Sequence, residues 1–233
     1  NRRIAEDKLR VYRFFRFTAS HGHEQFDEDG LVAVRKAASD LGHVSSERAG
    51  AEIRRMIALP RIARTLETMT ETAVLALPTD LLEQMGTYER RAHKPNAIGR
   101  LAILLQSLGS RTIKKQWRLS NDEITTAESI LVAAKLITDF HINEAAYRFP
   151  AFLSDAVEVA ATFAGWTEAG KSAIVEHLTT IDVPTFPVSG NDLLRRGMRP
   201  GPKIGAELDR LEQKWIQSGF KLDRTALLST VQR

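Results

Sequence analysis

The chain of 233 residues has no cysteine, which excludes disulfide bonds, thiolate metal sites and a cysteine nucleophile. It also has no apolar run near the ~18 residues that a membrane-spanning helix needs, and its first residues do not resemble a secretory signal. The sustained alternation of apolar and polar residues that marks a half-buried strand is missing as well. These absences favour a cytoplasmic protein without a β-sheet.

The overall composition indicates an ordinary globular protein. Hydrophobic residues make up 43% of the chain and charged residues 27%, which argues against global disorder. A chain of this length can bury a sizeable core, as one large domain or as two to three small ones.

Apolar residues recur at intervals of three and four, the spacing that places them on one face of an α-helix. Ile53, Met56 and Ile57 show this pattern, as do Leu101, Leu104, Leu105 and Leu108. Prolines divide the chain into short segments, and several segments begin with helix-capping residues: Ser45 or Ser46, Ser120 or Asn121, and Ser189 with Asp192 three positions later. We therefore predict an all-α fold, an irregular array of short helices.

Positive charge gathers at the two ends of the chain. Residues 1–17 contain six Lys or Arg against two acidic residues, and residues 185–233 contain nine against five. Each end has a net charge of +4 and the whole chain also has +4, so the part between the ends is near −4. Two basic ends indicate two contacts with a polyanion.

The opening segment, NRRIAEDKLRVYRFFRF, has two distinct faces when it is drawn as a helix. Val11 and Phe15 lie on the apolar face, whereas Asp7 and Arg10 are neighbours on the other. One interpretation is an intrahelical ion pair. The other is base reading, because a carboxylate beside a guanidinium matches the donors and acceptors of cytosine or adenine and opposes the carbonyl oxygen of guanine or uracil. The spacing alone leaves both open.

These residues resemble a motif of the class II tRNA nucleotidyltransferases, the family of the CCA-adding enzymes and the bacterial poly(A) polymerases. The family motif E-D-x-x-R, followed by R-x-x-R-F, corresponds here to Glu6-Asp7-Lys8-Leu9-Arg10, Arg13 and Arg16-Phe17. The resemblance implies that Asp7 and Arg10 form an amino-acid template that selects CTP and then ATP. It also implies that Glu6 positions Arg10, and that Arg13 belongs to the same nucleobase-binding group.

Three further stretches resemble the family in the same order along the chain. VSSERAGAEIRRMI at 44–57 is similar to the end of the family's neck, residues 99–124 to its body and residues 188–220 to its tail. The resemblance therefore implies a neck at residues 1–66, a helical body at 67–165 and a basic, tRNA-binding tail at 166–233.

The resemblance also implies a catalytic head that is not among these residues. In the family the head precedes the neck and carries an Asp-x-Asp pair that holds Mg²⁺, and we expect no such metal pair in this chain. The chain alone is then expected to be catalytically silent, whereas its parent adds C and A to tRNA 3′ ends from CTP and ATP. A poly(A) polymerase relative, or a non-enzymatic helical RNA-binding protein without a head, remains an alternative.

Four basic residues flank the tail segment GMRPGPKIG: Arg195, Arg196, Arg199 and Lys203. The glycines and prolines predict a left-handed helix cap at Gly197 and a new helix from about Lys203. The segment lacks the G-K-[ST] ending of a nucleotide-phosphate loop, but the free N–H groups of a helix start attract phosphate. The resemblance implies that this region meets the elbow of tRNA.

Three other features have simpler interpretations. His21-Gly22-His23 is more typical of a polar loop than of a metal site, and the run RRAHK at 90–94 predicts a solvated helix end. Trp215 is expected in a core or an interface, although its place in the basic tail leaves base stacking open.

Overall fold

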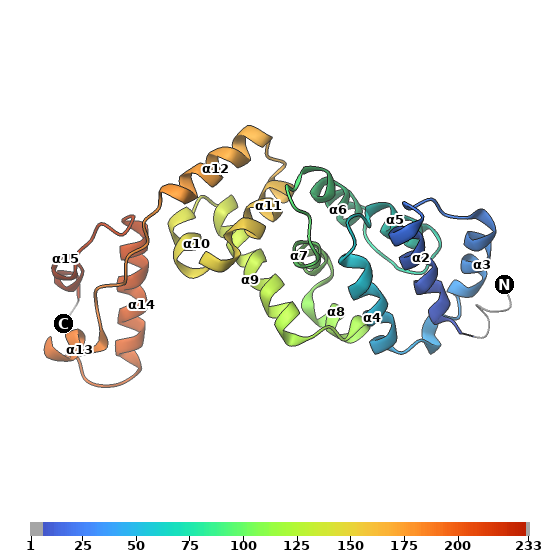
Figure 1. The fold of residues 1–233 in the computed structure, drawn as a ribbon. Helices are drawn as coiled ribbons and strands as arrows, with labels where there is room; N and C mark the ends of the chain where they lie inside the picture. Colours follow the sequence, from blue (N-terminus) through green and yellow to red (C-terminus); the bar gives the residue numbers. More distant parts are fainter. Residues whose placement is uncertain (1–6, 232–233) are drawn as a thin grey trace.

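A computed structural model describes residues 7–231 of the chain. Figure 1 shows these residues as an arch of helices with the two termini at opposite ends. In chain order the elements are α2 (Leu9–His21), α3 (Glu28–Ala38), η1 (Leu41–His43), α4 (Ser46–Ile57), α5 (Ala63–Glu71), α6 (Thr79–Arg91), α7 (Ala97–Leu108), α8 (Ser110–Trp117), α9 (Asn121–Thr138), α10 (Ile142–Arg148), η2 (Pro150–Phe152), α11 (Leu153–Ala164), α12 (Glu168–Thr180), α13 (Gly190–Arg195), α14 (Pro202–Gln217) and α15 (Arg224–Ser229). The described residues form no strand, so the predicted all-α class is confirmed.

Side chains cap the helix starts that the sequence predicts. The Ser45 hydroxyl accepts the backbone N–H of Arg48 at the start of α4, and Ser120 forms a reciprocal capping box with Glu123 at the start of α9. Each cap satisfies backbone donors that have no partner inside the helix.

One hydrophobic core extends from the first described helix through α11. It contains Val11 and Phe15 of α2, Ile53 of α4 and Leu104 of α7, each at most 1% exposed. These residues come from the apolar faces that the helical spacing predicts, so the helices from α2 to α11 share a continuous interior.

A buried ion pair between Arg100 and Glu89 holds the α4–α5 connection against α6 and α7. Arg100 of α7 is fully buried, and its Nε donates to Oε1 of Glu89 at 2.9 Å. Its Nη1 and Nη2 donate to the carbonyl oxygens of Ile57 and Pro60 at 3.0 and 2.7 Å. Glu89 also accepts the backbone N–H of Ile62 just before α5. Arg100 therefore donates to two backbone carbonyl oxygens that would otherwise lack a hydrogen-bond partner.

A second, smaller core lies in α13, α14 and α15 around Trp215, which is 1% exposed. Figure 1 shows these helices at the end of the arch, beyond an extended segment that follows α12. Tyr147 of α10 reaches this core, because its ring centroid lies 5.4 Å from that of Trp215 and its hydroxyl donates to Glu212 of α14 at 2.8 Å. Helices α13, α14 and α15 therefore have their own interior and contact the preceding helices through α10. Helix α12, within the predicted tail, packs instead against the first core.

Among the described helices, none is both long enough and apolar enough to cross a membrane.

Candidate functional site

Asp7 lies in the turn immediately before α2. Its Oδ1 accepts the backbone N–H of Leu9 at 3.1 Å, as expected for an acidic side chain at a helix start. Nη2 of Arg48, from α4, lies 3.2 and 3.4 Å from its two carboxylate oxygens. The spacing left an ion pair with Arg10 and base reading open. In the structure the Asp7 carboxylate pairs with Arg48 and not with Arg10, because α2 begins at Leu9 and leaves Asp7 facing the N-terminal turn of α4.

Arg10 and Arg13 follow on α2. Arg10 is exposed, and its backbone N–H donates to the carbonyl oxygen of Asp7 at 3.0 Å. Its guanidinium makes no hydrogen bond or ion pair with any residue that the structure describes. Arg13 is 43% exposed, and its Nε lies 3.7 Å from Oε1 of Glu52. Of the sequence-predicted nucleobase group, Asp7, Arg10 and Arg13 therefore lie at one end of one helix, and Glu6 lies outside the described residues.

Glu52 of α4 is a buried acceptor for several arginines. The side chain is 2% exposed, and Nε of Arg16 donates to its Oε2 at 2.6 Å while Nη1 of Arg55 donates to its Oε1 at 2.8 Å. Arg55 shares α4 with Glu52, whereas the contacts from Arg13 and Arg16 fix the rotation of α2 against α4. Glu52 and Arg48 lie in the stretch at 44–57, where the sequence motif indicated no role for either. No local pattern marks Glu52 as buried, because its burial depends on the packing of α2 against α4.

The basic tail residues surround one hollow of about 1070 Å³, lined by Arg195, Arg196, Arg199 and Lys203. Gly197 has a φ of +92°, which provides the predicted left-handed cap after α13. Pro202 occupies the first turn of α14, whose N-terminus therefore opens beside the same hollow. The structure thus brings all four predicted RNA-binding residues together.

The four residues differ in how free their charges are. Nη1 of Arg195 lies 3.6 Å from Asp192, whose carboxylate also accepts from Arg224. The Arg224 hydrogen bond, together with those from Ser189, holds the pKa of Asp192 well below its usual range. Within the part of the chain that the structure describes, Arg196 makes no ion pair, and the same holds for Arg199 and Lys203. These three cations are the ones available to a phosphate.

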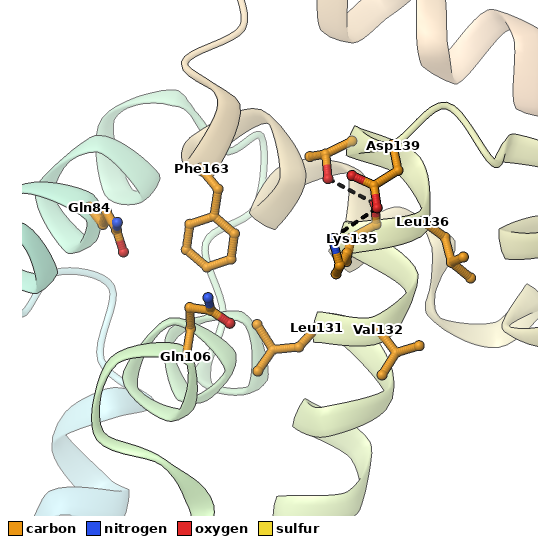
Figure 2. A pocket seen from close by; sticks show the side chains of 9 residues that line it. Gln84, Gln106, Leu131, Val132, Lys135, Leu136, Asp139 and Phe163 are labelled. Carbon is orange, nitrogen blue, oxygen red and sulfur yellow. Dashed lines mark hydrogen bonds and ion pairs between the residues drawn. The ribbon is translucent and has the colours of Figure 1, made fainter.

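A different hollow, of about 550 Å³, lies between α6, α7, α9 and α11. Figure 2 shows Phe163 and Leu131 on its walls, with Lys135 and Asp139 on its rim. Nζ of Lys135 donates to Oδ2 of Asp139 at 2.9 Å, so the two charges satisfy each other. The rest of the lining is apolar, amide or, at Thr138, hydroxyl, so the hollow has no free group suited to acid–base or metal chemistry.

The described residues form no cluster of three or more metal-ligating side chains. The triplet Asp27-Glu28-Asp29 has the Asp-x-Asp spacing that the sequence analysis did not expect in this chain. It opens α3, where the Asp27 carboxylate accepts the backbone N–H of Gly30 at 2.7 Å as a helix cap. Near His21 and His23, the Glu24 carboxylate accepts both the backbone N–H and the hydroxyl of Thr65.

Two further expectations change in detail. Trp215 is fully enclosed by its own core, so its ring is not available to stack on a base. Arg91 ends α6 as predicted, but its Nη1 donates to the carbonyl oxygen of Trp166 at 3.1 Å and is not simply solvated.

Two family models match the chain. A model described as "tRNA nucleotidyltransferase domain 2 putative" matches residues 95–231, which is more than half of the chain. The chain belongs to the tRNA nucleotidyltransferase family. A second model, described as "Probable RNA and SrmB- binding site of polymerase A", matches residues 25–77. Membership in the family confirms the resemblance seen in the sequence motifs.

Relatives in this family match nearly the whole chain but only part of their own length. The chain is 27% identical to the CCA tRNA nucleotidyltransferase 1, mitochondrial, of Danio rerio over 242 residues, covering 98% of the chain and 56% of that protein. It is 26% identical to the CCA-adding enzyme of Limosilactobacillus fermentum, covering 97% of the chain and 59% of that enzyme. The chain therefore spans little more than half the length of these curated relatives.

Solved structures show the same fold. The Bacillus stearothermophilus CCA-adding enzyme in complex with CTP has a TM-score of 0.72 and 25% identity, over 93% of this chain and 59% of that one. The Thermotoga maritima CCA-adding enzyme complexed with tRNA has a TM-score of 0.62 over 97% of this chain and 61% of that one. At 12% identity, this second likeness concerns the fold alone.

Proposed function

We propose that the chain is the nucleotide-selecting and tRNA-binding portion of a CCA-adding enzyme, which adds C and A to tRNA 3′ ends from CTP and ATP. The observation that carries this proposal is the match of 98% of the chain to 56% of a CCA tRNA nucleotidyltransferase. We divide the portion into a neck (1–66), a body (67–165) and a tail (166–233), and we place the parent protein in the cytoplasm.

Asp7 and Arg10 provide the base-reading chemistry in this proposal. The Asp7 carboxylate accepts the exocyclic amino group of cytosine or adenine, and the Arg10 guanidinium donates to the ring acceptors. The guanidinium of Arg10 is exposed and can bind a base directly. The Asp7 carboxylate first has to give up its ion pair with Arg48 to accept the amino group. Uracil and guanine present a carbonyl oxygen there, which leaves a desolvated acceptor facing the carboxylate.

Mg²⁺ belongs to the parent enzyme in this proposal. The described carboxylates do not fit a two-metal site, because Asp27 caps a helix and Glu52 and Glu89 are neutralised by buried arginine contacts. When bound, the metal supplies charge stabilisation for phosphoryl transfer. We assign its ligands to the part of the relatives that this chain does not match.

The test compares the full-length protein with the 233-residue chain on tRNA that lacks its 3′ end. With labelled CTP and ATP and with Mg²⁺, the full-length protein should add C and then A, and the chain alone should add nothing above buffer. Addition of a long run of A alone would identify a poly(A) polymerase instead. A full-length protein that adds no nucleotide to RNA would support the non-enzymatic alternative.

Replacing Asp7 with alanine in the full-length protein should weaken discrimination against UTP and GTP by about 1–3 kcal/mol, the value of one good base-edge contact. The fold should persist, since Asp7 is in the turn before α2 and is not part of the core. The measurement is the ratio of kcat/KM for CTP and UTP, with Asp40→Ala as a control for loss of a carboxylate in the same region. If Asp7→Ala excludes UTP as strictly as the unmodified enzyme, the template assignment is wrong.

Replacing Arg196 and Arg199 with glutamine should flatten the salt dependence of tRNA binding. Each phosphate contact contributes about 0.7–0.9 to the slope of log affinity against log salt, so the pair should remove about 1.4–1.8. The loss should be equal for tRNAs of different sequence, because phosphate contacts carry no base information. The matched control is Arg35→Gln/Lys36→Gln on α3. The basic residues at the end of α6 are less suitable as a control, because Nη1 of Arg91 donates to the carbonyl oxygen of Trp166. Equal slopes for the two double variants would contradict a specific tail contact.

A further inference from the structure

A basic island interrupts the acidic middle of the chain. Between Glu89 and Asp122 the sequence contains eight Lys or Arg and no Asp or Glu. Arg100 is buried and paired with Glu89, so it is not available to a ligand. Half of the island's cations lie within α8 or directly after it: Arg111, Lys114, Lys115 and Arg118. The average charge of the middle hides this local excess.

These cations lie on the solvent-exposed side of α8. Ile113 and Trp117 are 0% and 4% exposed and pack into the first core, so the opposite face is left to solvent. That face lines a shallow hollow of about 460 Å³, formed by Ser110 and the four cations. Arg118 has one carboxylate nearby, with Nε 3.5 Å from Glu47. Within the described part of the chain, Arg111, Lys114 and Lys115 make no ion pair.

The basic face is rigidly attached to the neck. Gly50 of α4 lies so close to α8 that a Cβ at this position would sit 1.6 Å from the carbonyl oxygen of Trp117. Only glycine allows this approach, and it fixes α8 directly beside α4, the helix that also carries Arg48 and Glu52. The cations therefore have a set place relative to Asp7 and Arg10.

The position of α8 along the arch relates it to the two predicted sites. In Figure 1, the N-terminal end of α2, the helix α8 and the connection between α13 and α14 all lie along the lower edge of the molecule. Helix α8 stands between the other two. A polyanion that met both ends of this edge would pass near α8.

We infer that the α8 face, Arg111, Lys114, Lys115 and Arg118, is a second phosphate-contacting surface, which holds the backbone of an RNA between the base-reading end of α2 and the basic tail. This inference rests on the proposed function, since it takes tRNA as the polyanion. A hollow that is shallow and lined by flexible cations suits phosphates along a backbone and offers no pocket for a base. The contact is therefore independent of RNA sequence and strongly dependent on salt.

The first test measures tRNA affinity of the 233-residue chain across a salt series. Lys114→Gln/Lys115→Gln should reduce the slope of log affinity against log salt by about 1.4–1.8. The matched control is Arg35→Gln/Lys36→Gln, because both pairs are exposed and both lie in the last turn of a helix. Unchanged thermal unfolding of each variant excludes a folding defect. A slope for the α8 variant equal to that of the α3 control or of the unmodified chain would overturn the inference.

The tail variant Arg196→Gln/Arg199→Gln separates this result from the proposed function. If the unmodified chain binds tRNA and only the tail variant flattens the slope, the α8 inference fails and the proposed function stands. If the chain shows no affinity for tRNA at low salt, the proposed function fails first. When both surfaces contact one RNA independently, the slope changes of the two double variants should add.

The second test exploits the absence of cysteine from the chain. A photoreactive group attached to Lys115→Cys should crosslink to bound tRNA, at nucleotides distinct from those reached from Arg199→Cys. The same group on Lys36→Cys should give a background yield. Crosslinking from Lys115→Cys no stronger than this background would overturn the inference, as would capture of an acidic protein partner in preference to RNA.

Discussion

Replacing Arg100 with alanine is expected to lower the free energy of unfolding by about 3–5 kcal/mol, the cost of breaking a buried ion pair by removing one partner. The Glu89 carboxylate would remain buried, 8% exposed, without its compensating charge. The carbonyl oxygens of Ile57 and Pro60 would lose their donors as well. Because these carbonyls lie at the end of α4 and in the connection to α5, this part of the chain should lose its fixed position against α7.

Urea unfolding followed by circular dichroism measures this loss. Arg90→Ala is the control, since Arg90 is exposed and contacts only Thr87 within the described residues. That surface change should stay within about 0.5 kcal/mol. A loss below about 1 kcal/mol for Arg100→Ala would mean that water or a rearranged side chain replaces the arginine.

Replacing Trp215 with alanine should destabilise the tail by about 3–5 kcal/mol, the range for truncating a buried aromatic side chain. The indole ring is surrounded by those of Tyr147, Phe186 and Phe220, with centroids 5.4, 5.4 and 4.8 Å away. The second core is much smaller than the first, so the loss of its central side chain removes a large share of its buried contacts. Helices α13, α14 and α15 should therefore unfold while the first core stays folded.

Hydrogen exchange resolved along the chain distinguishes the two cores. In Trp215→Ala, amides of α13, α14 and α15 should lose protection, and amides of α7, α9 and α11 should retain it. The tail contribution to the salt dependence of tRNA binding should disappear with the tail fold. Trp166→Ala is the comparison, because Trp166 is only partly buried against the first core. Uniform loss of protection in both cores would show that they unfold as one unit.

The features that the sequence predicts correctly are local ones. The cap at Ser120 depends on Glu123 three residues later, and the turn at Gly197 depends on the absence of a Cβ, so neighbouring residues contain the necessary information. The clustering of Arg196, Arg199 and Lys203 follows for the same reason, because a single tight connection brings them to one hollow.

The features that the sequence does not predict depend on residues far apart in the chain. Asp7 pairs with Arg48, 41 positions away, and not with the nearby Arg10. The spacing of three residues suggested a helical neighbour, but α2 begins only at Leu9. In the same way, the burial of Glu52 depends on the packing of α2 against α4, which no local pattern contains. The sequence did not predict the α8 face, because the negative net charge of the residues between the two basic ends does not reveal the local excess of Lys and Arg around α8.

In the proposed base-reading role, the Asp7–Arg48 ion pair sets the contacts of the carboxylate before a nucleotide binds. The two side chains are 32% and 53% exposed, and an ion pair of this exposure contributes only about 0–1 kcal/mol. Such a pair orients the carboxylate at a small cost to any group that replaces the arginine. An amino group that donates a well-aligned hydrogen bond can displace Arg48, whereas a carbonyl oxygen gains nothing by doing so. If Asp7 reads the base as proposed, the guanidinium of Arg48 occupies, before nucleotide binding, the position that the amino group of the base would take.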